Sequence, residues 1–210
     1  MANSKITGLS SASTPLNGTE VLPIVQSGST VQVSVANLTA GRGISASTGT
    51  FTGAITPSQT AGIVGTTTNN NANAGSIGEY ISSTVAVGSA VSLSTATGAF
   101  TGKTITSISL TAGDWDIFGS VGINNTSTTN FTAAAGGIST TSDTLSSSYE
   151  QETRFSYGAS GLVPNNVFSF VVPTLRVSIS STTTYYLIGY AQFTVSTATA
   201  FGQIMARRRR

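Results

Sequence analysis

Apolar side chains alternate with small polar ones through much of this chain, and this alternation constrains the fold more than any other feature of the sequence. In the clearest run, Trp115, Ile117, Gly119, Val121 and Ile123 take every second position. Alternate residues of a β-strand share a face, whereas an amphipathic helix repeats every 3.6 residues, a period that no ten-residue stretch here shows. Serine and threonine occupy 67 of the 210 positions, and β-branched and aromatic residues are frequent. The pattern therefore predicts an all-β protein.

About eight strands are expected in the second half of the chain, separated by turns rich in Gly, Ser and Thr. The expected strand segments are 76–87, 91–94, 103–110, 115–123, 131–138, 167–172, 175–179, 185–195 and 201–206. Short antiparallel strands in this number are typical of two packed sheets. We therefore expect residues 77–210 to form a jelly-roll-like β-sandwich domain.

A smaller β-unit is predicted within residues 1–41. An apolar run broken by Pro23 leads into a turn around Gly28, and an alternating run of valines follows. This pattern predicts a β-hairpin whose first strand lies at an edge, because proline cannot donate a ladder hydrogen bond. A two-stranded hairpin is too small to be stable alone, so it must dock on copies of itself or on another protein. The apolar residues expected at that interface are Val21, Ile24, Val31, Val33 and Val35.

Residues 42–76 connect these two parts and consist largely of Gly, Ser, Thr and Asn. Two structures fit this composition: a flexible linker, or a thin intertwined shaft in which sister chains supply one another's missing neighbours. In either case the segment is a spacer between an N-terminal attachment unit and a C-terminal sandwich.

The strand expected at 185–195 is apolar on both of its faces. Leu187 lies on one face, while Tyr186, Ile188 and Tyr190 lie on the other. Only one face of a strand meets the core of a sandwich, so the second face is predicted to meet a partner chain. We therefore expect a homo-oligomer, and sheets packed around an axis would typically form a trimer.

The chain contains no histidine and no cysteine, and only 16 of its residues are charged. It therefore lacks an imidazole base, a thiolate nucleophile, a disulfide and the common zinc ligands. We expect neither enzymatic activity nor a cofactor nor a metal site. The composition favours a structural or binding protein.

Two pairs of carboxylates remain as candidates for chemistry. Asp114 and Asp116 flank Trp115, and Glu150 and Glu152 are spaced in the same way. Two carboxylates on one face of a strand can support glycoside hydrolysis or bind a divalent cation. The favoured interpretation is structural, with Asp114 in a turn, Asp116 facing solvent and Trp115 in the core.

The last four residues, 207–210, are all arginine and account for the basic character of the chain. Without them the net charge of +2 becomes −2. A nucleic-acid-binding surface would need basic residues spread over the domain, so nucleic acid is not the favoured partner. Three interpretations remain: a solvated tail, pairing with carboxylates of a neighbouring subunit or docking protein, or contact with nucleic acid or an anionic glycan.

Targeting signals are not evident in the sequence. No apolar stretch reaches the length of about 20 residues that spans a bilayer. The first residues, MANSKITGLSSAS, lack the apolar segment of a secretory signal. We expect a protein made in the cytoplasm without signal-dependent export.

Both ends of the chain resemble proteins of bacteriophage particles. The segments KITGL at 5–9, TPLNGTEVLPIVQ at 14–26 and VQVSVANL at 31–38 resemble the N-terminal segment of many tailed-bacteriophage fibre and appendage proteins. The segments LTAGDWDI at 110–117, TYYL at 184–187 and QIMARR at 203–208 are similar to C-terminal domains of phage virion structural proteins. The resemblance leaves 42–76 uncovered.

This resemblance implies a trimeric virion protein that is made in the host cytoplasm. Its N-terminal segment would attach to the capsid or tail, and its β-rich domain would project outward. The short chain favours a head fibre, a capsid decoration or a small tail appendage. Two alternatives stay open: a tail-fibre adsorption module that binds host-surface glycans through tyrosine, tryptophan and hydroxyl side chains, and a carbohydrate-cleaving enzyme that uses Asp114 and Asp116.

Overall fold

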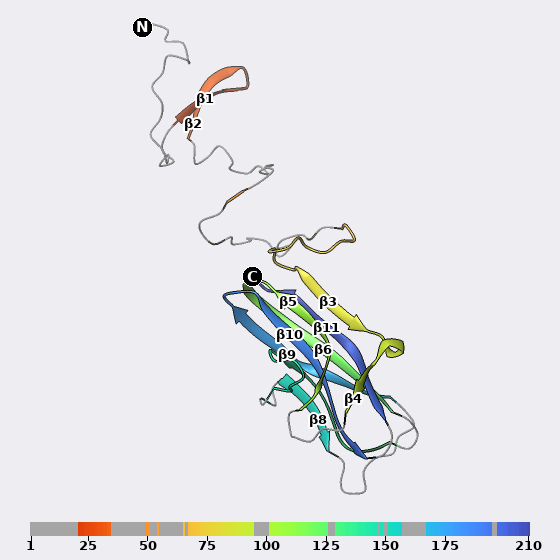
Figure 1. Cartoon of the computed structure of the whole chain (residues 1–210). Helices are drawn as coiled ribbons and strands as arrows, with labels where there is room; N and C mark the ends of the chain where they lie inside the picture. The colour runs from red at the N-terminus through yellow and green to blue at the C-terminus, as the bar shows by residue number, and fades with distance from the viewer. Residues whose placement is uncertain are drawn as a thin grey trace. The chain divides into compact units, whose positions relative to one another are not determined.

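The computed structural model describes residues 21–34, 49–50, 54, 65, 67–94, 101–125, 129–146, 148, 151–156, 167–194 and 197–210. The chain divides into two compact units, residues 1–66 and 67–210, which are considered separately (Figure 1). In the described ranges the regular structure is strand, apart from one short 3-10 helix, so the predicted all-β class is confirmed. No helix in these ranges is long and apolar enough to cross a membrane.

The first unit contains the predicted hairpin. Strands β1 (Val21–Gln26) and β2 (Ser29–Ser34) pair antiparallel through a two-residue turn. Ser27 and Gly28 both have positive φ, at 51° and 79°, as the tight turn of a twisted hairpin requires. The register places Leu22 opposite Val33 and Ile24 opposite Val31, so these four apolar side chains share one face.

The second unit is a sandwich of two antiparallel sheets. One sheet has the strand order β3-β11-β6-β9, with β4 also paired to β11, and the other has the order β5-β10-β7-β8. The strand bounds are β3 Tyr80–Val85, β4 Val91–Leu93, β5 Lys103–Leu110, β6 Gly113–Asn125, β7 Asn130–Ser139, β8 Glu152–Ser156, β9 Phe168–Ile179, β10 Thr183–Thr194 and β11 Ala198–Arg208.

The strand order is that of a jelly roll. If β4 is left aside, eight described strands remain in this unit. The first pairs with the last (β3 with β11) and the second with the seventh (β5 with β10). The third pairs with the sixth (β6 with β9) and the fourth with the fifth (β7 with β8). Such pairing arises when one long antiparallel ribbon folds over on itself into two sheets. Strand β4 pairs with β11 beyond the end of β3, after the 3-10 helix η3 (Val87–Ser89), as the neighbouring ribbons in Figure 1 show.

The core lies between the two sheets and is built from the alternation seen in the sequence. Trp115, Ile117, Val121 and Ile123 of β6 are all fully buried. Gly119 continues this row, and a Cβ there would lie only 2.9 Å from Cδ1 of Leu187 in the facing sheet. Each large apolar side chain buried in this way contributes about 1.5–3 kcal/mol to stability.

Hydroxyl groups join the two sheets along both open sides of the sandwich. On one side, Oγ of Ser83 in β3 lies 2.6 Å from Oγ1 of Thr106 in β5. On the other side, Oγ1 of Thr153 in β8 donates to the carbonyl oxygen of Val171 in β9 at 2.7 Å. The sheet edges therefore face one another across short side-chain contacts.

Two strand predictions need correction. Strand β8 was not expected, because Glu152–Ser156 has no alternating apolar pattern. The segments 167–172 and 175–179 were expected as separate strands but form the single strand β9. Pro173 is tolerated inside β9 because β9 is an edge strand, and the register with β6 shifts between Ile117 and Gly119.

The expectation that a partner chain covers the second face of β10 is wrong for two residues. Ile188 and Tyr190 are 0% and 2% exposed within the chain itself. They form a second apolar cluster with Leu145 from the loop that follows β7 and with alanines of β7, and Tyr186 packs against this cluster. The chain therefore covers most of this face with its own residues.

Truncation of a core side chain tests this packing. The Leu187→Ala variant is expected to lose about 2–5 kcal/mol of unfolding free energy, because it opens a cavity where both sheets meet. Val171→Ala is a matched control, since Val171 is 77% exposed, and should change stability by less than about 0.5 kcal/mol. Urea titrations measure both values, and equal losses in the two variants would contradict this core.

Candidate functional site

Asp114 and Asp116, the first predicted carboxylate pair, lie at one end of β6 and are neutralised by arginines of the same chain. Asp114 is buried, and its Oδ2 lies 3.5 Å from Nη2 of Arg176 and in ion-pair contact with Nε of Arg210. Oδ2 of Asp116 lies 3.3 Å from Nε of Arg209. These contacts are those of a structural charge network.

Arg208 is the most deeply buried arginine of this network. It is 5% exposed, and its Nε donates to Oε2 of Glu79 at 2.8 Å. Its Nη1 donates to the carbonyl oxygen of Ala112 at 2.8 Å, and its Nη2 donates to Oγ1 of Thr111 at 2.5 Å. The guanidinium carbon lies 4.3 Å from the ring centroid of Trp115, so a cation–π contact completes its surroundings.

Gly113 leaves the space that the Arg208 guanidinium occupies. A Cβ at this position would collide with Nη1 of Arg208, and the φ of 141° is one that other residues rarely adopt. Trp115 is held from the same turn, because its Nε1 donates to the carbonyl oxygen of Thr111 at 2.9 Å. The buried Trp115 confirms its predicted place in the core.

Hydrogen bonds and charges of this network lower the pKa values of Glu79 and Asp114. Burial would raise the pKa of Glu79, but hydrogen bonds from Arg208 and Gly75 and the charge of Arg208 outweigh it and lower that pKa. The hydrogen bond from Ser178 is the main cause that lowers the pKa of Asp114, and Arg210 and Arg176 add to it against the effect of burial. Both carboxyls are therefore held as carboxylates.

Of the second predicted carboxylate pair, the structure describes Glu152 alone. Glu150 lies outside the described residues. Glu152 is buried, and its Oε1 accepts a hydrogen bond from Nε of Arg154 at 3.0 Å. The guanidinium of Arg154 lies over the ring of Tyr190, 4.8 Å from its centroid. In the described ranges, no three acidic side chains gather in a way that could hold a metal ion.

The arginine run is a solvated tail only in part, because Arg208 is buried while Arg207, Arg209 and Arg210 are exposed. Arg208 is part of β11, and Arg209 and Arg210 pair with aspartates of their own chain. Beside them lies a surface hollow of about 340 Å³, lined by Ile77, Gly78 and residues 207–209. The intersubunit and anionic-partner interpretations of the run stay predictions.

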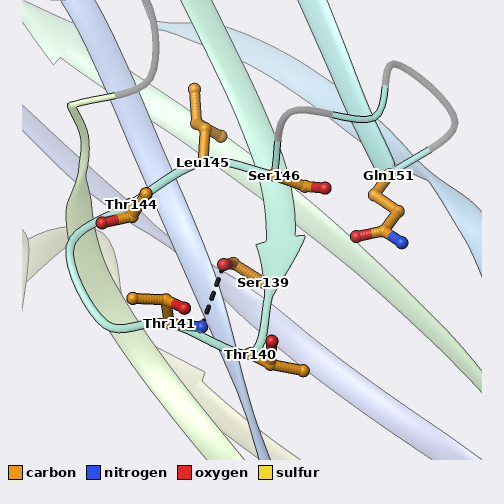
Figure 2. A pocket seen from close by; sticks show the side chains of 7 residues that line it. All are labelled: Ser139, Thr140, Thr141, Thr144, Leu145, Ser146 and Gln151. Carbon is orange, nitrogen blue, oxygen red and sulfur yellow. Dashed lines mark hydrogen bonds between the residues drawn. The ribbon is translucent and has the colours of Figure 1, made fainter.

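A second hollow, the hydroxyl pocket, lies where β7 ends and β8 begins, and Figure 2 shows the side chains around it. Its volume is about 330 Å³. It is lined by Ser139, Thr140, Thr141, Thr144, Leu145, Ser146 and Gln151. Five of these seven residues carry a hydroxyl group, one carries an amide, and none is charged, so the wall both donates and accepts hydrogen bonds.

The loop that forms this pocket is fastened to the start of β5. Oδ1 of Asp143 accepts a hydrogen bond from the Thr104 amide at 2.7 Å, and Oγ1 of Thr104 accepts one from the Asp143 amide at 2.9 Å. Nζ of Lys103 lies 3.3 Å from Oδ2 of Asp143. The hydrogen bond from the Thr104 amide is the main cause that lowers the pKa of Asp143. The other side of the loop is anchored by Leu145, which is 2% exposed.

The residues predicted for an interface fall into three groups. In the hairpin, Val21 is 53% exposed, while Ile24, Val31 and Val33 are half-buried. Val35 lies outside the described residues. In the sandwich, Tyr186 is half-buried next to the pocket loop, while Ile188 and Tyr190 are covered by the chain itself. The interface role of the hairpin residues and of Tyr186 stays a prediction.

Comparisons with known proteins identify no family. No protein-family model matches the chain, and no curated protein does. Among solved structures, the subviral particle of infectious bursal disease virus VP2 is similar at 13% identity and a TM-score of 0.36. The match covers 62% of this chain and 32% of that chain. A likeness at this level identifies neither a family nor a function.

Breaking the buried Arg208–Glu79 pair should be costly. Arg208→Met leaves the Glu79 carboxylate buried without its cation and should lower the unfolding free energy by about 3–5 kcal/mol. The control Lys103→Met breaks an exposed pair and should cost at most about 1 kcal/mol. The double variant Glu79→Gln with Arg208→Met should recover part of the loss. Denaturant titrations decide this, and a loss no larger than that of the control would contradict the role given to Arg208.

Acidification should destabilise the fold. The pKa values of Glu79 and Asp114 lie below their ordinary values of 4.5 and 3.8. As the pH falls, these two carboxyls therefore take up protons in the unfolded chain before they do so in the folded one. The stability that they supply is complete at a pH above their ordinary pKa values, and it is lost as the pH falls to their lowered pKa values in the folded chain. Thermal unfolding followed from about pH 6 to pH 3 measures the loss. It should be smaller in Glu79→Gln, and an unchanged melting temperature in the wild type would refute the prediction.

Proposed function

We propose that this chain is a non-enzymatic structural component of a bacteriophage particle. In this proposal it forms a trimeric fibre or spike, of the head-fibre, capsid-decoration or small tail-appendage kind. The N-terminal hairpin docks on the particle, and the sandwich projects outward. The proposed location is the virion, after synthesis in the host cytoplasm.

The hairpin carries this proposal. Its Leu22, Ile24, Val31 and Val33 form one continuous apolar face, and the strands β1 and β2 contain no charged residue. Val25, on the opposite face, is 76% exposed. A hairpin of two strands with such surfaces is stable only when something covers it. An attachment segment that folds against a particle or against sister chains has this character.

The sandwich supports the proposal in a different way. Jelly rolls are frequent in capsid and lectin domains, which is an analogy at the level of fold. The resemblance of both chain ends to phage virion proteins agrees with that analogy. The carboxylates Asp114, Asp116 and Glu152, which sequence reasoning considered for catalysis, each contact an arginine. That arrangement favours a scaffold over an acid–base site.

Oligomeric state is the first test. Native mass spectrometry of the full chain should show a species of three times 21.2 kDa. Light scattering should show the same species in solution. A stable monomer at micromolar concentration would contradict the trimer.

Attachment through the hairpin is the second test, and the chain offers a matched pair of variants. Val31 lies on the apolar face of β2, whereas its neighbour Gln32 points to the other face. Val31→Asp should abolish incorporation into particles, because it places a charge in the docking surface, and Gln32→Asp should not. Electron cryo-microscopy and immunoblots of purified particles measure incorporation. Equal incorporation of both variants would overturn the docking role of this face.

A further inference from the structure

We propose that the hydroxyl pocket between β7 and β8 binds a neutral saccharide. This inference concerns the sandwich alone and does not depend on how the chain attaches to a particle. It is carried by three observations: the chemistry of the pocket wall, the way its loop is held, and the aromatic ring next to it.

The wall has the polarity that a sugar requires. The hydroxyls of Ser139, Thr140, Thr141, Thr144 and Ser146 and the amide of Gln151 line a volume of about 330 Å³. Hydroxyl and amide groups both donate and accept hydrogen bonds, as the hydroxyls of a sugar do. The volume is at the lower end of the range of roughly 300–1,000 Å³ that ligand pockets occupy.

Among the residues that the structure describes, the charged side chains near the pocket are already paired. Asp143 contacts Lys103 and the Thr104 amide, and Glu152 contacts Arg154. Because none of the seven lining residues is charged, an anionic or cationic ligand would find no counter-charge in the wall. The lack of charge among the seven lining residues favours a neutral ligand.

The pocket is preorganised. Two hydrogen bonds join Asp143 to Thr104, and Leu145 is packed into the apolar cluster with Ile188 and Tyr190. Within the loop, Oγ of Ser139 accepts a hydrogen bond from the Thr141 amide at 3.0 Å, the contact drawn in Figure 2. The described part of the loop, residues 139–146, is held by these contacts, and residues held in this way lose little conformational entropy when a ligand binds.

Tyr186 supplies an aromatic ring on the same face. It is the direct partner of Ser139 in the β10–β7 register, so both side chains leave the sheet on one side. Its ring is half-buried and packs against the cluster that anchors Leu145. The apolar face of a sugar ring can pack on an aromatic ring while the hydroxyls of the sugar reach the polar wall.

Binding by the full chain tests the proposal directly. The probes are the neutral oligosaccharides maltohexaose, chitotetraose and a β-galactan hexamer, with dextran sulfate as an anionic contrast. Saturation-transfer NMR and calorimetry should detect at least one neutral probe, with amide shifts centred on Thr141 and Ser146. No binding by any neutral probe, or equal binding of dextran sulfate, would overturn the proposal.

Variants locate the site. Thr140→Val with Gln151→Leu removes two polar groups of the wall and should weaken binding by about tenfold or more. Thr174→Val is the matched control, because it makes the same change at an exposed position on β9, and should bind as the wild type does. If the double variant keeps full affinity, the saccharide binds elsewhere and the assignment of this pocket is wrong. The amide shifts of the wild type locate the bound saccharide without any variant, and shifts centred away from the pocket would also overturn the assignment.

Discussion

The insertion of strand β11 between β3 and β6, secured at its end by Arg208, is the constraint on which the rest of the sandwich depends. β11 pairs with the earliest strands of this unit, β3 and β4, on one side and with the long central strand β6 on the other. At its end, the Arg208 amide donates to the Glu79 carbonyl and its side chain reaches Glu79, Thr111 and Ala112. Pairing of first with last strand makes the contacts of this sheet distant in sequence, so the fold is complete only when β11 is in place.

The same network explains where the scarce charged residues are used. The arginine run and the Asp114–Asp116 pair are far apart in the sequence but form one feature of the structure. Backbone hydrogen bonds between Arg209 and Asp114 and between Asp114 and Arg210 bring these groups together. Charges at this end hold strands in place, while uncharged hydroxyl groups form the pocket at the end of β7. A second charged group, Asp143 with Lys103 and the Thr104 amide, holds the loop of that pocket.

Much of the fold could be predicted from sequence because alternation is a local signal. The bounds of β5 were predicted without error, the row from Trp115 to Ile123 is buried as expected, and the hairpin was placed correctly. Strand β8 was missed because its five residues do not alternate. The covering of Ile188 by Leu145 was also missed, because it depends on a loop distant in the sequence. The hydroxyl pocket had no usable sequence signal, since serine and threonine are common everywhere in the chain.

Native-state hydrogen exchange of the full chain tests the closing role of β11 most directly. If β11 closes the sandwich, the amides of Arg208 and Ile204 should exchange only when the whole sandwich opens, with the same free energy as the amides of Val121 and Ile123 in β6. Exchange of the β11 amides at a clearly lower free energy than those of β6 would show that β11 opens by itself, and would contradict the closing role of this strand.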